Sequence, residues 1–232
     1  WLSGMLHDVG RFEQIKRYNT FSDADSVDHA KFGADLLFKD GLISTFLKGM
    51  VKCTGYKPGA LEDRYDSDGV FLYDRLNKSD MEMLELAIRC HNMYRIPQGL
   101  NSREQAFCNV LRDADKVDIF KVNIDTPLEE IYNTTTEELM KSNITDEVLE
   151  AFDEEHCILK AIRRTPADTV IGHVSLAYEL VYDESVRITV EQGYLAKLMH
   201  FHSDNEETNR KMAMVREKMD SYVKKRIGEK DA

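Results

Sequence analysis

The stretch Leu6-His7-Asp8-Val9-Gly10 decides how the rest of the chain is read. It places a histidine directly before an aspartate, after an apolar run and before a glycine. Both side chains are metal ligands in proteins, and both are costly to bury without a partner. Neighbouring residues on a helix point about 100° apart, so the pair can meet one ion only where a helix ends. Gly10 predicts that end, and Asp8 could also bridge two ions because a carboxylate has two oxygens.

Two further histidines lie on the apolar faces of expected helices. Asp28 is a capping residue, and His29 follows it on the inward face. His91 continues the helical spacing of a segment that begins near Ser79 or Asp80. These faces are completed by Gly33, Leu36 and Leu37 and by Leu84, Ala87 and Ile88. One inward histidine is usually a satisfied core residue, but the whole set favours a metal site assembled from several helices.

An aspartate on an inward helix face would complete this group of metal ligands, and there are two candidates for it. Asp113 and Asp115 lie about 200° apart around a helix, so they cannot both face one ion. Apolar neighbours accompany each of them, and periodicity alone does not choose. Lys116 could hold a phosphate oxygen or could be a solvated charge. Arg11 and Arg17 are similar candidates on weaker grounds.

Composition narrows the class of protein. The 232 residues carry a formal charge of −11, which argues against a general binder of nucleic acid or anionic membranes, whose surface is basic. The four cysteines show no CxxC pairing, which is typical of reduced thiols in a cytoplasmic protein. No apolar run reaches the roughly 18 residues of a membrane span. The scarcity of proline and the recurring three-four spacing predict helix nearly throughout.

Local signals place several elements. We expect a first helix that stops at Gly10, a long loop over residues 11–26, and short helices and loop over 50–79. Ser102 and Gln105 suggest a capping box. Thr165-Pro166 is a helix start, and the last helix is expected over about 206–226. The remaining histidines, His156, His173, His200 and His202, are expected to be surface or core residues.

The ordered motifs resemble the HD-domain metal-dependent phosphohydrolase superfamily in its two-metal, bacterial-like form. The matching segments are His7-Asp8-Val9-Gly10-Arg11, Asp28-His29-Ala30 with Gly33 and Leu37, Arg89-Cys90-His91-Asn92 and Asp113-Ala114-Asp115-Lys116. The resemblance covers about residues 1–122. It implies an all-α fold with a helical-bundle HD core over 1–125 and a C-terminal helical extension over 126–232, packed on the core. The first histidine of that family has no counterpart here, and we expect it on a helix upstream of Trp1.

The resemblance also implies roles for individual residues. The metal ligands would be His7, Asp8, His29, His91 and Asp115, with Asp8 bridging. Members of the family place an Asp-Lys or Asp-Arg pair at the last position, which favours Asp115 and leaves Asp113 as the fallback. Asp8, Lys116 and Arg11 would be the catalytic residues, the two cations meeting the substrate phosphate. The cofactor would be one or two divalent ions of Mn, Fe, Mg, Ni, Co or Zn.

The expected activity is hydrolysis of a phosphomonoester or phosphodiester by metal-activated water. The expected partner is a small phosphorylated substrate, a nucleotide, and neither nucleic acid nor a membrane; homodimerisation stays open. The chain after His91 lacks the Gly-Tyr-Pro signature of the cyclic-dinucleotide branch, which argues against a cyclic dinucleotide. Two alternatives are a di-iron HD-type oxygenase and a non-catalytic module that binds a nucleotide or metal and signals through its C-terminal helices.

Overall fold

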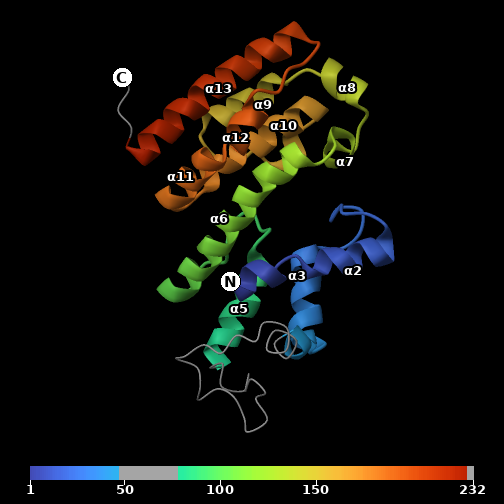
Figure 1. Cartoon of the computed structure of the whole chain (residues 1–232), viewed down its shortest axis with the longest axis vertical. Coiled ribbons are helices and arrows are strands. Elements are labelled where there is room, and N and C mark those ends of the chain that lie inside the picture. The colour runs from blue at the N-terminus through green and yellow to red at the C-terminus, as the bar shows by residue number, and fades with distance from the viewer. Residues whose placement is uncertain (47–77, 229–232) are drawn as a thin grey trace. The chain divides into compact units, whose positions relative to one another are not determined.

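A computed structural model describes residues 1–46 and 78–228 of the chain. Every regular element in that part is a helix (Figure 1), so the predicted all-α fold is confirmed. None of the helices described is long and apolar enough to cross a membrane. The short helices and loop expected over 50–79 lie outside the described residues, except for the last two positions.

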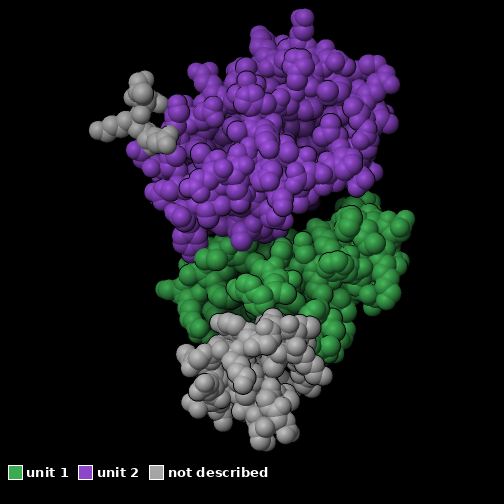
Figure 2. Space-filling view, in the orientation of Figure 1, with its two compact units in different colours: residues 1–111 green, residues 112–232 purple. Residues whose placement is uncertain are grey.

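Two compact units divide the chain, residues 1–111 and residues 112–232 (Figure 2). The division falls inside α6 (Ser102–Asp125) and therefore within a continuous helix. No linker rich in proline or glycine marks it. The division expected from the sequence, an HD core over 1–125 with a helical extension over 126–232 packed on it, stays a prediction.

The first unit is built around α3. The elements in its described part are α1 (Leu2–Leu6), α2 (Val9–Tyr18), α3 (His29–Ala34), the π-helix η1 (Asp35–Lys39), α5 (Lys78–Cys90) and the first part of α6. Helix α3 packs against both α2 and α5. Leu84, Ala87 and Ile88 on α5 are buried at the expected helical spacing, and they share a core with Leu6 and Leu37. As predicted, Asp28 caps α3, its side chain accepting a hydrogen bond from the amide of Lys31.

The prediction of a helix end at Gly10 and a loop beyond it is wrong. Helix α1 ends at Leu6, and α2 runs on through Gly10 to Tyr18. A Cβ atom at Gly10 would overlap the carbonyl oxygen of His29 and lie 2.8 Å from the amide nitrogen of Gly33. The glycine is therefore needed for the close crossing of α2 and α3, and it does not stop a helix.

The predicted capping box of α6 is displaced by one position. The side chain of Asn101 accepts hydrogen bonds from the amides of Arg103 and Glu104, and Glu104 accepts one from the amide of Asn101. The two residues satisfy each other's backbone donors in the reciprocal way that a capping box requires. Asparagine caps a helix as well as serine does, and the choice of Ser102 was wrong.

The second unit has a core of its own. After α6 its elements are α7 (Leu128–Tyr132), α8 (Thr136–Lys141), α9 (Asp146–Asp153), η4 (Lys160–Ile162), α10 (Pro166–Val174), η5 (Ser175–Glu179), α11 (Asp183–Gln192), α12 (Tyr194–Met199) and α13 (Glu206–Ile227). Thr165 caps α10 ahead of Pro166, as predicted. Met212 and Met219 of α13 are buried in this core, whereas Met214 is exposed.

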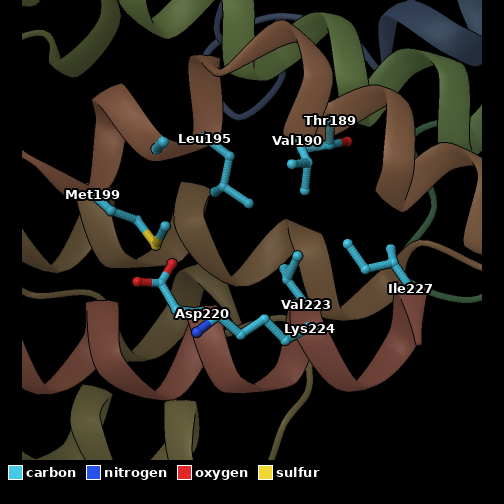
Figure 3. Close-up of a pocket in the computed structure, with 9 residues that line it drawn as sticks. Thr189, Val190, Leu195, Met199, Asp220, Val223, Lys224 and Ile227 are labelled. Carbon is cyan, nitrogen blue, oxygen red and sulfur yellow. The ribbon is translucent and has the colours of Figure 1, made fainter. Parts of the chain in front are cut away.

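A small apolar cavity of about 180 Å³ lies between α11, α12 and α13 (Figure 3). Val190, Leu195, Met199 and Val223 line it, and Asp220 and Lys224 of α13 border it. The charged side chains at this cavity are Asp220 and Lys224. In the first unit, by contrast, Asp8, His29 and His91 bring a carboxylate and two imidazoles together.

Candidate metal centre

The His-Asp pair occupies the turn between two helices. His7 follows the last residue of α1, where its backbone amide donates to the carbonyl of Ser3. Asp8 directly precedes α2 and has a non-helical backbone, with φ −97° and ψ 12°. Because the two residues lie outside regular helix, their side chains are not forced about 100° apart. The angle between neighbouring side chains on a helix therefore does not prevent His7 and Asp8 from contributing to one site.

One oxygen of Asp8 and the Nε2 atoms of His29 and His91 lie close together, although the three residues are far apart in the sequence. His29 begins α3 and His91 follows α5 directly, and both side chains are buried. The Nε2 atoms of His29 and His91 lie 3.1 Å apart. Oδ1 of Asp8 lies 3.3 Å from Nε2 of His29 and 3.5 Å from Nε2 of His91. Neighbouring ligands on a Zn²⁺-like ion, at about 2.0–2.2 Å from it, are roughly 3.0–3.5 Å apart, so the triangle has the size of one face of a metal site.

The outer nitrogens of both rings are committed to acceptors. Nδ1 of His91 lies 2.7 Å from the carbonyl oxygen of Ile88, which can only accept. Nδ1 of His29 lies 2.7 Å from Oδ2 of Asp23. Each Nδ1 therefore carries a hydrogen, and in a neutral ring Nε2 is left with a lone pair. Two lone pairs and a carboxylate oxygen then face one another, an arrangement that needs a cation or a proton between them.

Charge and burial at Asp8 fit such a cation. Its Oδ1 atom is buried and makes no hydrogen bond of good geometry. Burial opposes the charge, but when no metal is bound the protonated rings of His29 and His91 outweigh it and hold the pKa of Asp8 below its ordinary value. At His29, burial lowers the pKa, but the hydrogen bonds to Asp23 and Asp8 outweigh burial, and the pKa of His29 is raised. These His and Asp side chains could therefore hold a metal ion.

His7 belongs to the same group of side chains. Its ring lies edge-on to that of His91, with centroids 4.9 Å apart. Its Nδ1 donates to the carbonyl of Gly4 at 2.8 Å, and its Nε2 lies 3.6 Å from Oδ2 of Asp8. The two oxygens of Asp8 thus face different histidines. The Asp8 side chain is 47% exposed, which leaves room for ligands from solvent.

Asp23 is the residue that sequence reasoning missed. It lies in the polar stretch Ser22–Ser26, and both of its carboxylate oxygens are within 2.9 Å of Nδ1 of His29. Burial is outweighed by the donors His29 and Gln14 and by the charge of Arg11, so the pKa of Asp23 is lowered. Its neighbour Asp25 is also an acidic residue of that stretch. Local sequence offers no signal that separates the two.

The two arginines near the pair have partners on the protein itself. Arg11 donates from Nη1 to Asp23, at 2.9 Å, and to the carbonyl of Phe21. Its Nε lies 4.0 Å from Oδ1 of Asp8. Arg17 pairs with Glu13 at 2.8 Å and lies over the ring of Phe32. Both arginines therefore have structural partners within the first unit.

The two competing aspartates lie on α6 in the second unit. Asp113 is buried, and its carboxylate accepts hydrogen bonds from the backbone amides of Val181 and Tyr182, all at 3.0 Å. Its oxygens are committed to the backbone, which leaves Asp115 as the better ligand candidate. Lys116 is 6% exposed, and burial, followed by the charge of Arg112, lowers its pKa. The triangle described above is made by residues of the first unit alone.

Comparison with known proteins adds no relative. No protein-family model, no curated protein and no solved structure matches this chain.

Proposed function

We propose that this chain is a cytoplasmic metal-dependent phosphohydrolase of the HD-domain type. The proposal is carried by the triangle of Asp8 Oδ1, His29 Nε2 and His91 Nε2, with edges of 3.1, 3.3 and 3.5 Å. A divalent ion held there would act as a Lewis acid on a phosphoryl oxygen and lower the pKa of a bound water. Mn, Fe, Mg, Ni, Co and Zn are the candidates.

The residues divide into ligands and substrate contacts. His29, His91 and Oδ1 of Asp8 would hold one ion, while His7 and Oδ2 of Asp8 face the position of a second. The resemblance to the HD family adds Asp115 as a further ligand. It also gives Lys116 the task of offsetting negative charge on the phosphate. The substrate would be a phosphomonoester or phosphodiester, with a nucleotide first among the candidates.

A second function is favoured by one observation. Two histidines and one carboxylate that share a face, with open positions opposite, are also the ligand set of non-haem iron oxygenases. Asp8, His29 and His91 form such a set. With a second iron held by His7 and Oδ2 of Asp8, the alternative would be a di-iron HD-type oxygenase, which differs in the metal it needs and in the consumption of oxygen.

Metal content and turnover of the full chain, measured together, test the proposal. We expect bound metal in the isolated protein and phosphate release from a nucleotide panel with added Mn²⁺. Iron as the bound metal, with oxygen uptake and no phosphate release, would favour the oxygenase. Binding of neither metal nor substrate would overturn both.

Asp8→Ala should abolish metal binding and turnover together, because Asp8 supplies an oxygen to each side of the site. Asp40→Ala removes an exposed aspartate of the same unit and is the matched control. It should leave both properties unchanged. Retained turnover in Asp8→Ala would contradict the assignment of Asp8 as a metal ligand.

A further inference from the structure

Asp23 lies directly behind His29, on the side away from Asp8. Nδ1 of His29 is 2.7 Å from Oδ2 and 2.9 Å from Oδ1 of this carboxylate, while its Nε2 faces the ligand triangle. The Asp23 carboxylate therefore contacts one side of the His29 imidazole, and the other side of this ring faces the proposed metal position. A carboxylate in that place fixes the tautomer and the orientation of a histidine ligand and makes its other nitrogen more basic.

Several donors hold the carboxylate of Asp23 in place. Arg11 and Gln14 reach Oδ1 at 2.9 and 3.0 Å, and Asn92 reaches Oδ2 at 3.3 Å. Together with His29, they match the roughly four acceptor sites of an ionised carboxylate. Asp23 is therefore held as an anion in one orientation.

Gln14 shows that this arrangement is built into the fold. Its side chain is fully buried, and the two hydrogens of its amide nitrogen are shared among Asp23, Ser26 Oγ and the carbonyl of Val27, at 2.9–3.0 Å. Its amide oxygen accepts from Arg11. A buried polar side chain whose donors and acceptor are all satisfied is rigid. The loop that carries Asp23 is thus pinned to α2.

The two inward histidines are supported unequally. His91 relies on the neutral carbonyl of Ile88, whereas His29 has an ionised carboxylate, and charge-assisted hydrogen bonds are about twice as strong as neutral ones. His29 is thus the better supported ligand of the pair.

We propose that Asp23, braced by Arg11 and Gln14, is the positioning residue that sets the metal affinity of the site through His29. The proposal rests on the metal site argued above. It also reassigns Arg11, which acts here on Asp23 and not on a substrate phosphate. Removal of Arg11 should then weaken metal binding even when no substrate is present.

The test is titration of the metal-free full chain with Co²⁺ alone, followed by calorimetry and by the visible absorption of the bound ion. Asp23→Ala should weaken binding by about 10- to 100-fold, the usual effect of losing such a support. Asp23→Asn keeps an acceptor oxygen for His29 and should fall between Asp23→Ala and the unaltered protein. Arg11→Ala should weaken Co²⁺ binding in the same direction. The absorption of bound Co²⁺ should change in all three variants.

Asp25→Ala is the matched control, because it removes an exposed aspartate from the same stretch and should bind Co²⁺ as the unaltered protein does. Far-UV circular dichroism of the metal-free variants checks the fold, and Asp23→Asn decides the question if Asp23→Ala is unfolded. Binding within twofold of the unaltered protein in folded Asp23 variants would overturn the inference. Failure of the unaltered protein to bind any metal would instead overturn the proposed function.

Discussion

One hydrogen bond behind each of three histidines decides which ring nitrogen faces the site. The acceptors are the carbonyls of Gly4 and Ile88 and the carboxylate of Asp23. Each acceptor receives a hydrogen bond from Nδ1–H, so that Nε2 points inward in all three rings. A metal ligand must present a lone pair. Backbone carbonyls provide for this at His7 and His91, and the Asp23 carboxylate provides for it at His29, before any ion arrives.

Sequence could identify the inward histidines but not these acceptors. The apolar faces around His29 and His91 predicted their burial, and the structure confirms it. Two of the acceptors are backbone carbonyls, which every residue has, and the third is one of two aspartates in Ser22–Ser26. Side-chain identity therefore reveals the ligand, whereas its support depends on the path of the chain.

Gly10→Ala is the sharpest test of the helix crossing that brings His29 to Asp8. The added Cβ would overlap the carbonyl oxygen of His29 itself. Overpacking of this kind usually costs about 1–3 kcal/mol, so the midpoint of urea unfolding should fall and metal affinity should fall with it.

Gly4→Ala is the control for that variant, because a Cβ there meets nothing within 4 Å. It lies within α1 and should be neutral or stabilising by up to about 1 kcal/mol. Equal stability of the two variants would show that α2 and α3 do not cross as closely as described.

At the scale of elements, the caps of α3 and α10 were predicted correctly, whereas the end of the first helix was not. Asp28 and Thr165 precede their helices with side chains that accept from the first turn, and this chemistry is local. Gly10 was misread because a glycine that ends a helix and a glycine that lets two helices touch look alike in sequence. The second use depends on Gly33, which belongs to another helix.

Asp168 joins two elements of the second unit, and its loss should be costly. The carboxylate is fully buried and accepts from the backbone amides of Thr145, Arg164 and Thr165. Asp168→Ala would leave these donors unsatisfied, at about 1–3 kcal/mol for each one that water cannot reach. We expect a loss of about 3 kcal/mol in the free energy of unfolding, measured with urea.

The capping box of α8 provides the comparison. Asp168 completes the capping box of α10, and Glu138 completes that of α8 but is exposed, so water can replace its hydrogen bonds. Glu138→Ala should therefore cost clearly less than Asp168→Ala. An equal loss would mean that burial of Asp168 does not matter.

For the whole molecule, the division into two cores could not be predicted from the sequence. Cys108 and Leu111 of α6 belong to the core of the first unit, and Val117 and Phe120 belong to cores of the second. The division falls inside a helix, so no turn or linker residue announces it. Helical periodicity gives the faces of α6 but not the partners of each face.

Hydrogen exchange of the full chain with and without Mn²⁺ would map the metal site onto these units. Binding stabilises the folded state, so the amides that follow Asp8, those of residues 20–30 and those around His91 should exchange more slowly. If Asp115 is a ligand, the peptide that contains it should also gain protection, and Asp115→Asn should remove that gain alone. Helices α11 and α13 carry no proposed ligand and serve as the internal control. Protection that appears only there, or equally along the whole chain, would contradict a metal centre at Asp8, His29 and His91.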